Sequence, residues 1–287
     1  MPSPTIILTG HRGFIGSALK EVLQDQFPGD LLAVTCDLRD AHQVADELGQ
    51  IENDSVTVVH LATVNRCDCL TYEGYSANCA MLMNLIRATD RFSSRNFLFA
   101  SSTDVFGAPA SLPLTESSPH QPQDWYALSK SIGEWILHQT KVDHAVFRLP
   151  GVFGARANER SLLRRLFQQG IEVGSVRLTS QGQVLRDFVY LEDLIALFQE
   201  WIALPRSGVW NVASGEASSL EITLTELRSL ANVAFEIDLQ TEKSPRDFNL
   251  VFDSSHLQQS FPSARIRPAI RVLKDYLAAT LRNAVAA

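Results

Sequence analysis

The sequence predicts an α/β fold, a doubly wound parallel sheet with a smaller C-terminal lobe. The first residues run from an apolar strand through a glycine-rich turn into a helix, and strands then alternate with helices through the first half of the chain. Such alternation is typical of a parallel sheet covered on both faces. A chain of 287 residues, 45% of them hydrophobic, can bury the core that this sheet requires. We expect one domain over residues 1–154, to which the chain returns around 187–215, and a second lobe formed mainly by residues 155–287.

The individual elements follow from apolar patterns between turn residues. The first strand is expected at Thr5–Thr9, and the helix after it repeats apolar residues at helical spacing from Ile15 until Pro28-Gly29 ends it. Later strands are expected at residues 31–35, 56–61, 96–100 and 145–149, and two long helices at residues 77–87 and 126–139.

Composition and charge argue against several classes of protein. A formal net charge of −7 disfavours a nucleic-acid or membrane surface as the main partner. The chain shows no apolar segment of membrane-spanning length and no signal peptide, so we expect a soluble, cytoplasmic protein. The four cysteines, Cys36, Cys67, Cys69 and Cys79, form no disulfide framework. The Cys67-Asp68-Cys69 run lacks a second pair of ligands, so no metal is expected.

A glycine-rich turn follows the first strand directly, with the spacing Gly10-x-x-Gly13-x-x-Gly16. Glycines allow a tight turn and a close backbone approach, and the N-terminus of the following helix attracts a pyrophosphate. The spacing departs from the commoner G-x-G-x-x-G, and a plain turn is the alternative interpretation. The position between a strand and a helix favours a dinucleotide site.

Tyr126 and Lys130 form a second candidate site, four residues apart on a predicted helix. Positions i and i+4 are neighbours on a helix, so the Lys130 ammonium is expected to lower the Tyr126 pKa from its ordinary value of about 10. A phenol adjusted in this way can transfer protons at neutral pH. A half-buried ring beside a snorkelling lysine is the ordinary alternative. The glycine turn in the same chain favours the proton-transfer interpretation.

Taken together, the motifs resemble the extended short-chain dehydrogenase/reductases of the NAD-dependent epimerase/dehydratase type. This Rossmann-fold family includes sugar-nucleotide epimerases, dehydratases and 4-ketoreductases, and the motif forms are closest to GDP-fucose synthase and the 4-ketoreductases. The resemblance extends over nearly the whole chain, through residues 9–16, 37–40, 58–62, Asn78, 101–107, 126–130, 186–190 and 245–247.

The resemblance implies a catalytic set of Ser102, Tyr126 and Lys130. Ser102 would orient the substrate oxygen, Tyr126 would exchange its proton, and Lys130 would hold the nicotinamide ribose during hydride transfer. Ser101 and Thr103 are the neighbours with which Ser102 could be confused. The implied cofactor-binding residues are Gly10, Arg12, Gly13, Phe14, Ile15, Gly16, Asp37, Leu38, Arg39, Leu61, Ala62, Thr63 and Asn78, together with Tyr126 and Lys130.

The cofactor is expected to be NADP, with NAD as the alternative. The second strand ends in Thr35, where NAD enzymes of this design carry an acidic residue. The resemblance instead puts Arg12 at the 2′-phosphate, with Arg39 as a second candidate. Each arginine could equally be an ordinary solvated surface residue.

The substrate is expected to be a nucleotide-sugar. The resemblance implies that Arg186 and Arg246 hold its diphosphate, a role that suits planar guanidinium groups. Each is followed by an aspartate, so an ordinary ion pair is the alternative. The implied substrate-binding residues are Ser102, Thr103, Asp104, Arg186 and Arg246.

Departures from the family narrow the expected reaction. Dehydratases carry an Asp-Glu pair where this chain has Thr103-Asp104, and residues 154–166 contain no histidine of the kind that GDP-fucose synthase uses. Gly151 replaces an asparagine that contacts the sugar-nucleotide in many relatives. A 4-ketoreductase or C4-epimerase is therefore expected. A reductase of a non-nucleotide carbonyl compound and a non-catalytic NAD(P)-binding regulator remain open. The two long helices favour a homodimer, with a monomer as the alternative.

Overall fold

The structure, a computed structural model, describes residues 3–156, 161–245 and 247–286, and it divides into two compact units. Unit 1 consists of Met1–Gly107, His120–Arg148 and Phe198–Trp210. Unit 2 consists of Ala108–Pro119, Leu149–Leu197 and Asn211–Ala287. The chain first leaves unit 1 after Gly107 for the short segment Ala108–Pro119, leaves it again after Arg148, and returns for the last time at Phe198–Trp210.

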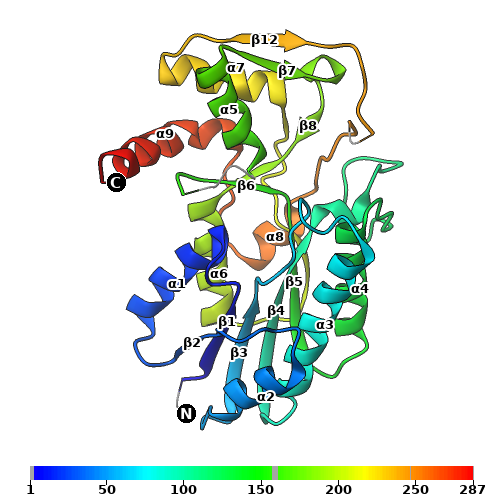
Figure 1. The fold of residues 1–287 in the computed structure, drawn as a ribbon, viewed down its shortest axis with the longest axis vertical. Helices are drawn as coiled ribbons and strands as arrows, with labels where there is room; N and C mark the ends of the chain where they lie inside the picture. The colour runs from blue at the N-terminus through cyan, green and yellow to red at the C-terminus, as the bar shows by residue number, and fades with distance from the viewer. Residues whose placement is uncertain (1–2, 157–160, 246, 287) are drawn as a thin grey trace. The chain divides into compact units, whose positions relative to one another are not determined.

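Unit 1 is built around a sheet of six strands in the order β10-β5-β4-β3-β1-β2 (Figure 1). Strand β1 pairs in parallel with both β2 and β3, and β3 pairs in parallel with β4. The parallel sheet confirms the predicted fold class. The strands are β1 (Thr5–Thr9), β2 (Leu31–Ala33), β3 (Ser55–His60), β4 (Ser94–Ser102), β5 (Asp143–Leu149) and β10 (Gly208–Asn211).

The strand order places a topological switch point at β1, because β2 lies on one side of β1 and β3 on the other. Open α/β sheets bind ligands beyond the carboxyl ends of the strands at such a point. The segments that follow β1, β3 and β4 are therefore the place to look for a site.

Strand β2 ends at Ala33, two residues before the predicted end. The backbone N–H groups of Thr35 and Cys36 donate to the carboxylate of Glu47, each with a shortest distance of 2.9 Å. A side chain thus satisfies donors that a longer strand would have placed in the ladder.

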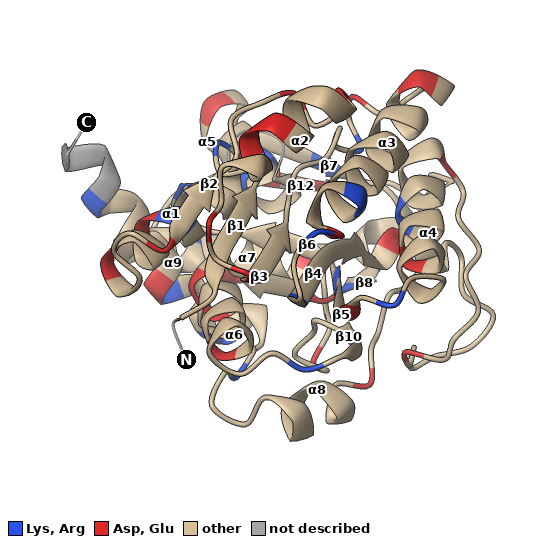
Figure 2. Ribbon diagram, turned by 90° about the horizontal axis from the view of Figure 1, so that it is seen from below, with Lys and Arg blue, Asp and Glu red and all other residues tan. Residues whose placement is uncertain are grey.

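Helices cover both faces of this sheet. Figures 1 and 2 show α2, α3 and α4 along one face and α1 on the other. Asp40 and Asp124 cap α2 and α4 by accepting hydrogen bonds from first-turn N–H groups. The helices are α1 (Phe14–Gln26), α2 (Ala41–Gly49), α3 (Tyr72–Thr89) and α4 (Trp125–His138), with a short 3₁₀ helix η1 (Thr103–Phe106) after β4.

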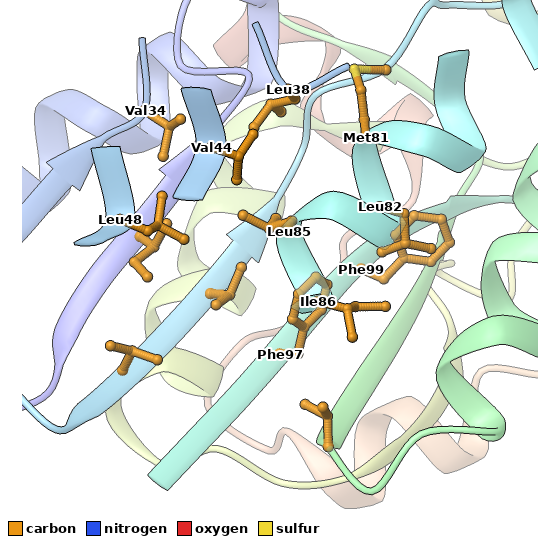
Figure 3. Close-up of a cluster of buried hydrophobic side chains, with 14 of the residues drawn as sticks. Val34, Leu38, Val44, Leu48, Met81, Leu82, Leu85, Ile86, Phe97 and Phe99 are labelled. Carbon is orange, nitrogen blue, oxygen red and sulfur yellow. The ribbon is translucent and has the colours of Figure 1, made fainter. Parts of the chain in front are cut away.

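Apolar side chains from the strands, α2 and α3 pack together under one face of the sheet (Figure 3). Leu85, fully buried in this cluster, lies on α3. Truncation of such a leucine to alanine costs about 2–5 kcal/mol of stability. The residues labelled in Figure 3 are Val34, Leu38, Val44, Leu48, Met81, Leu82, Leu85, Ile86, Phe97 and Phe99.

The described residues of unit 2 form three pairs of short strands and an apolar core of their own. The pairs are β6 (Gly151–Phe153) with β9 (Phe188–Tyr190), β7 (Ser175–Leu178) with β12 (Glu236–Leu239), and β8 (Leu185–Arg186) with β11 (Ser218–Ser219). The remaining helices in the described part of the chain are α5 (Leu162–Val173), η2 (Ser180–Gly182), α6 (Leu191–Ala203), α7 (Leu220–Ala231), α8 (Ser255–Ser260) and α9 (Ala269–Ala286). Helix α6 crosses from unit 2 into unit 1 at Phe198.

Charged residues lie mostly on helices and connecting segments, and the strands of the large sheet are almost free of them (Figure 2). Both units carry residues of either sign. Among the described residues, no helix has the length and apolar character needed to span a membrane.

Candidate functional site

The glycine turn lies against the segment that follows β3. Gly10 has a φ of +71°, and a Cβ added there would lie 2.6 Å from the backbone nitrogen of Ala62. A Cβ on Gly16 would lie 2.2 Å from the carbonyl oxygen of Gly10. Only glycine fits either position, so two segments that were predicted to bind cofactor, the turn and residues 61–63, lie side by side in unit 1.

The helix N-terminus at this turn is open to an anion. Phe14 and Ile15 begin α1, no side chain caps the helix at Gly13, and its first turn carries no acidic residue. Exposed N–H groups at a helix N-terminus, approached through glycine, are the features that hold a pyrophosphate. The residues present therefore fit a dinucleotide.

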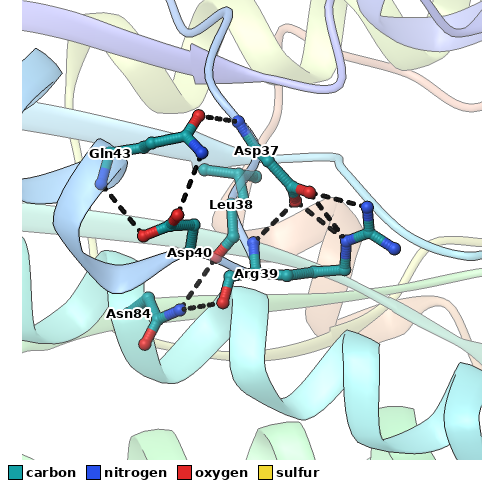
Figure 4. Close-up of polar contacts among 6 residues, drawn as sticks. All are labelled: Asp37, Leu38, Arg39, Asp40, Gln43 and Asn84. Carbon is teal, nitrogen blue, oxygen red and sulfur yellow. Dashed lines mark hydrogen bonds and ion pairs between the residues drawn. The ribbon is translucent and has the colours of Figure 1, made fainter.

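The side chains of Asp37 and Arg39 form an ion pair with each other (Figure 4). The Arg39 guanidinium donates to both Asp37 carboxylate oxygens, at 2.6 Å for the shortest contact, and lowers the Asp37 pKa to about 2. Leu38 between them is buried in the apolar cluster, and its carbonyl accepts a hydrogen bond from Asn84. Arg39 is thus less available for a 2′-phosphate, and Leu38 contributes to the core.

Several charges surround the end of β2, where NAD and NADP differ in what they require. Arg12 is exposed on the glycine turn. The carboxylate of Glu47 lies at Thr35 and Cys36, so an acidic group does stand near the end of this strand, contributed by α2. Sequence reasoning missed it because the carboxylate comes from the next helix.

Asn78 organises the segment after β3. Its amide oxygen accepts from the backbone N–H of Val64 at 2.7 Å and from the Thr63 hydroxyl at 3.2 Å. Its amide nitrogen donates to the Val64 carbonyl and, at 3.1 Å, to the Ser129 hydroxyl on α4. These bonds use both ends of the Asn78 amide, so its role in the structure is to hold the predicted nicotinamide segment against α3 and α4.

His60 at the end of β3 is neutral. Its Nδ1 lies 2.8 Å from the Thr9 hydroxyl, which also accepts from the Ala62 N–H. Burial and the Lys130 ammonium lower the His60 pKa to about 3. The ring therefore joins the ends of β1 and β3 without titrating near neutral pH.

Ser102, Tyr126 and Lys130 come together at the carboxyl end of β4. Ser102 lies close enough to the Tyr126 phenol to lower its pKa. The Lys130 ammonium lies 5.7 Å from the centre of the Tyr126 ring and donates to the Ala100 carbonyl at 2.8 Å. Helix α4 presents Tyr126 and Lys130 one turn apart, and the end of β4 supplies the serine.

The Tyr126 pKa differs from the sequence expectation. It is raised above the ordinary phenol value, chiefly because the protein shields the group from water and secondly because of the Asp104 carboxylate. The neighbouring Ser102 and the charge of Arg66 lower the Tyr126 pKa and so act in the opposite direction. The expected lowering by Lys130 is not found in the protein alone, because the ammonium is directed at the Ala100 carbonyl.

Lys130 is buried, and burial lowers its pKa to about 8. Cys69 and Glu134 favour the charged form and limit this decrease. The ammonium also lies 4.9 Å from the centre of the Phe99 ring, a cation–π contact. Lys130 therefore changes charge within a pH range that is relevant to catalysis.

Arg66 is a charged group at this site that sequence reasoning missed. It lies beyond the end of β3 and forms an ion pair of 3.3 Å with Asp104, which stands in η1 beyond β4. Both charges act on the Tyr126 phenol. The position of Arg66 in the sequence could have identified it, because a charged residue a few positions after a buried strand lies at the edge of the sheet where ligands bind. Thr103, between Ser102 and Asp104, is buried.

Two of the residues that were predicted to bind the substrate, Arg186 and Arg246, belong to unit 2. The Arg186 guanidinium donates to the carbonyls of Phe248 and Leu185 and lies over the Phe248 ring. Arg246 lies outside the described residues. A Cβ on Gly151 would lie 2.9 Å from the Phe188 ring, so the asparagine of the relatives would require that ring to move.

Within the described ranges, no cluster of three or more His, Cys, Asp or Glu side chains could hold a metal ion. Cys67 is exposed and Cys69 is buried, and both are free thiols.

Comparisons with known proteins agree with this geometry. The model of the NAD dependent epimerase/dehydratase family matches residues 6–213. A putative UDP-glucose 4-epimerase of Methanocaldococcus jannaschii is 24% identical over 75% of this chain and 78% of its own length. A putative GDP-L-fucose synthase 2 of Arabidopsis thaliana is 26% identical over 79% of this chain and 76% of its own length.

Two solved structures share the fold. RMD from Pseudomonas aeruginosa, complexed with NADPH, has a TM-score of 0.79 at 20% identity and covers 97% of this chain and 99% of its own. WbmG from Bordetella bronchiseptica, complexed with NAD and UDP, has a TM-score of 0.82 at 20% identity and covers 99% of this chain and 97% of its own. Because the family match extends over most of the chain and includes the glycine turn, Ser102, Tyr126 and Lys130, this protein belongs to the NAD-dependent epimerase/dehydratase family, a family of extended short-chain dehydrogenase/reductases.

Proposed function

We propose that the chain is an NAD(P)-dependent sugar-nucleotide oxidoreductase of the 4-ketoreductase or C4-epimerase type. The observation that carries this proposal is that Ser102 lies beside Tyr126, with Lys130 one turn away on α4, at the ligand-binding edge of a sheet that also carries an open glycine turn. A protein that only binds a nucleotide would have no need of this proton-transfer arrangement.

The proton chemistry follows from the charges around the phenol. Tyr126 is protonated at neutral pH because its pKa is raised, so it can donate to a substrate carbonyl oxygen that Ser102 orients. The dinucleotide, when bound, would supply or accept the hydride. In the reverse direction Tyr126 must lose its proton, and the charge of Arg66 favours the phenolate. The protonated resting form favours reduction.

A Tyr126→Phe variant tests this role. We expect it to bind the dinucleotide as the wild type does and to lose at least about a hundredfold in turnover, the size of one general acid–base contribution. Near-normal turnover would reject Tyr126 as the proton carrier.

For the cofactor we propose NADP over NAD, on the strength of Arg12 in the glycine turn. Arg39 already pairs with Asp37, so Arg12 would carry most of the selection, against the opposing negative charge that Glu47 brings to the end of β2. An Arg12→Ala variant should lose affinity for NADPH and keep its affinity for NADH. Equal wild-type affinities for NADH and NADPH would count against Arg12.

For the substrate we propose a nucleotide-sugar, the class named for the relatives. A thermal-shift panel that crosses NADH and NADPH with UDP, GDP, CDP and dTDP tests both halves of the proposal, since a ligand that binds the folded state stabilises it. A dinucleotide shift without any nucleoside-diphosphate shift would favour a non-nucleotide carbonyl substrate. No dinucleotide shift would reject the enzyme interpretation. Replacing Arg186 with alanine should raise the KM for a nucleotide-sugar and leave the KM for a non-nucleotide carbonyl substrate unchanged.

A further inference from the structure

Three consecutive residues of β4 each face one member of a series on α4. The Ala100 carbonyl accepts a hydrogen bond from Lys130, and Ser102 lies beside Tyr126. Ser101 lies between them and donates to the carboxylate of Glu134 at 2.5 Å. Tyr126, Lys130 and Glu134 are spaced at i, i+4 and i+8, so they follow one broad face of the helix.

Glu134 is held from the other side by β5. Arg148 donates to both Glu134 carboxylate oxygens, at 2.8 Å for the shortest contact, and both side chains are buried. Arg148 also donates to Nε2 of His120 at 2.8 Å. Arginine cannot accept a hydrogen bond, so His120 accepts with Nε2 and donates from Nδ1 to Ser131. His120 is therefore neutral, in agreement with the lowering of its pKa by burial.

The charge balance explains why a carboxylate stands here. A buried charge is costly unless it is paired. The groups that face Lys130 are Glu134 and Tyr126 on α4, Cys69 from the segment before α3, and His60 on β3. Since His60 is neutral, Glu134 is the carboxylate among the residues that act on the ammonium.

We propose that Glu134 is a positioning residue of the reaction centre. Its hydrogen bond from Ser101 holds the end of β4 against α4, in the register that puts Ser102 beside Tyr126, and its carboxylate lies one helical turn beyond Lys130. This role rests on the proposed function, since it matters for catalysis only if Ser102, Tyr126 and Lys130 carry out the proton transfer.

The decisive variant is Glu134→Gln, which retains an acceptor for Ser101 and removes the charge. The chain has five lysines, so ¹³Cε-lysine NMR can follow Lys130 directly, with Lys130→Arg to assign its signal. We expect the Lys130 titration midpoint to move to lower pH by about one unit. We also expect the alkaline limb of the kcat/KM profile to move with it, and kcat to fall about tenfold.

Two further variants separate the charge of Glu134 from its hydrogen bond with Ser101, which is called the tether below. Ser101→Ala removes the tether and leaves the charge, so kcat should fall while the Lys130 midpoint stays in place. Glu52→Gln removes an exposed carboxylate elsewhere in unit 1 and should change neither quantity. An unchanged Lys130 midpoint with an unchanged kcat in Glu134→Gln would overturn the proposal, even if its melting temperature fell.

Failure of this inference can be told apart from failure of the proposed function. The NMR titration requires no cofactor or substrate, so it reports on Lys130 even if the wild type binds no dinucleotide. If Glu134→Gln does not fold, a normal kcat in Ser101→Ala would by itself refute the tether.

Discussion

The packing of the glycine turn predicts a graded response to alanine substitution. An alanine Cβ at position 16 would lie 2.2 Å from the carbonyl oxygen of Gly10, and one at position 13 would lie 3.2 Å from the same oxygen. The first distance is about 1 Å shorter than the second, which is itself close to the limit of ordinary contacts. Gly16→Ala therefore forces α1 and the turn apart by about 1 Å.

That movement displaces the N–H groups that would hold the pyrophosphate. Hydrogen bonds tolerate only a few tenths of an ångström, and a misplacement of about 1 Å can cost roughly a hundredfold. We expect Gly16→Ala to weaken NADPH binding by about 10- to 100-fold, or about 1.4–2.8 kcal/mol. Gly13→Ala should weaken binding by a smaller factor.

Isothermal titration of the purified variants with NADPH measures this loss. Gly49→Ala provides a matched control at the end of α2, because its nearest neighbour is Nη1 of Arg91 at 3.9 Å. This control should bind normally and melt at the same temperature or slightly higher, since alanine is the better helix former. Equal affinities for Gly16→Ala and Gly49→Ala would refute the packing argument.

Two further predictions concern the phenol and the assembly. Asp104→Asn removes a charge that raises the Tyr126 pKa, so the rise of the oxidation rate with pH should move to lower pH. Arg66→Ala should move this rise to higher pH, because Arg66 lowers the Tyr126 pKa. Stopped-flow measurements of the oxidation rate from pH 6 to 10 test both variants, and shifts in the same direction would contradict this reasoning. Trp135 on α4 is 61% exposed, and if α3 and α4 form the expected homodimer, Trp135→Asp should yield a monomer in light scattering. A wild type that is already monomeric would reject that assembly.

Much of unit 1 could be inferred before the structure was known. The strand, glycine turn and helix at the start of the chain and the strands β2 to β5 follow local patterns of apolar residues and turn formers, whereas the sixth strand, β10, was not predicted. The placement of Tyr126 and Lys130 one turn apart on α4 followed from helical spacing alone. Glu134 is the next member of the same series and could have been found by extending it.

What required the tertiary structure was the electrostatic state of these groups. Helical spacing predicted a lowered Tyr126 pKa, but burial and Asp104 raise it, and Lys130 is directed at a carbonyl of β4. Arg66 and Asp104, which form an ion pair, are 38 residues apart in sequence.

There is a physical reason why the sequence predicted the backbone elements but not the electrostatic state of the site. Backbone conformation depends largely on neighbours within a few residues, so periodicity reveals strands, turns and helices. A pKa depends on how much water a group loses and on which charges face it, and those charges come from segments that only the folded sheet brings together.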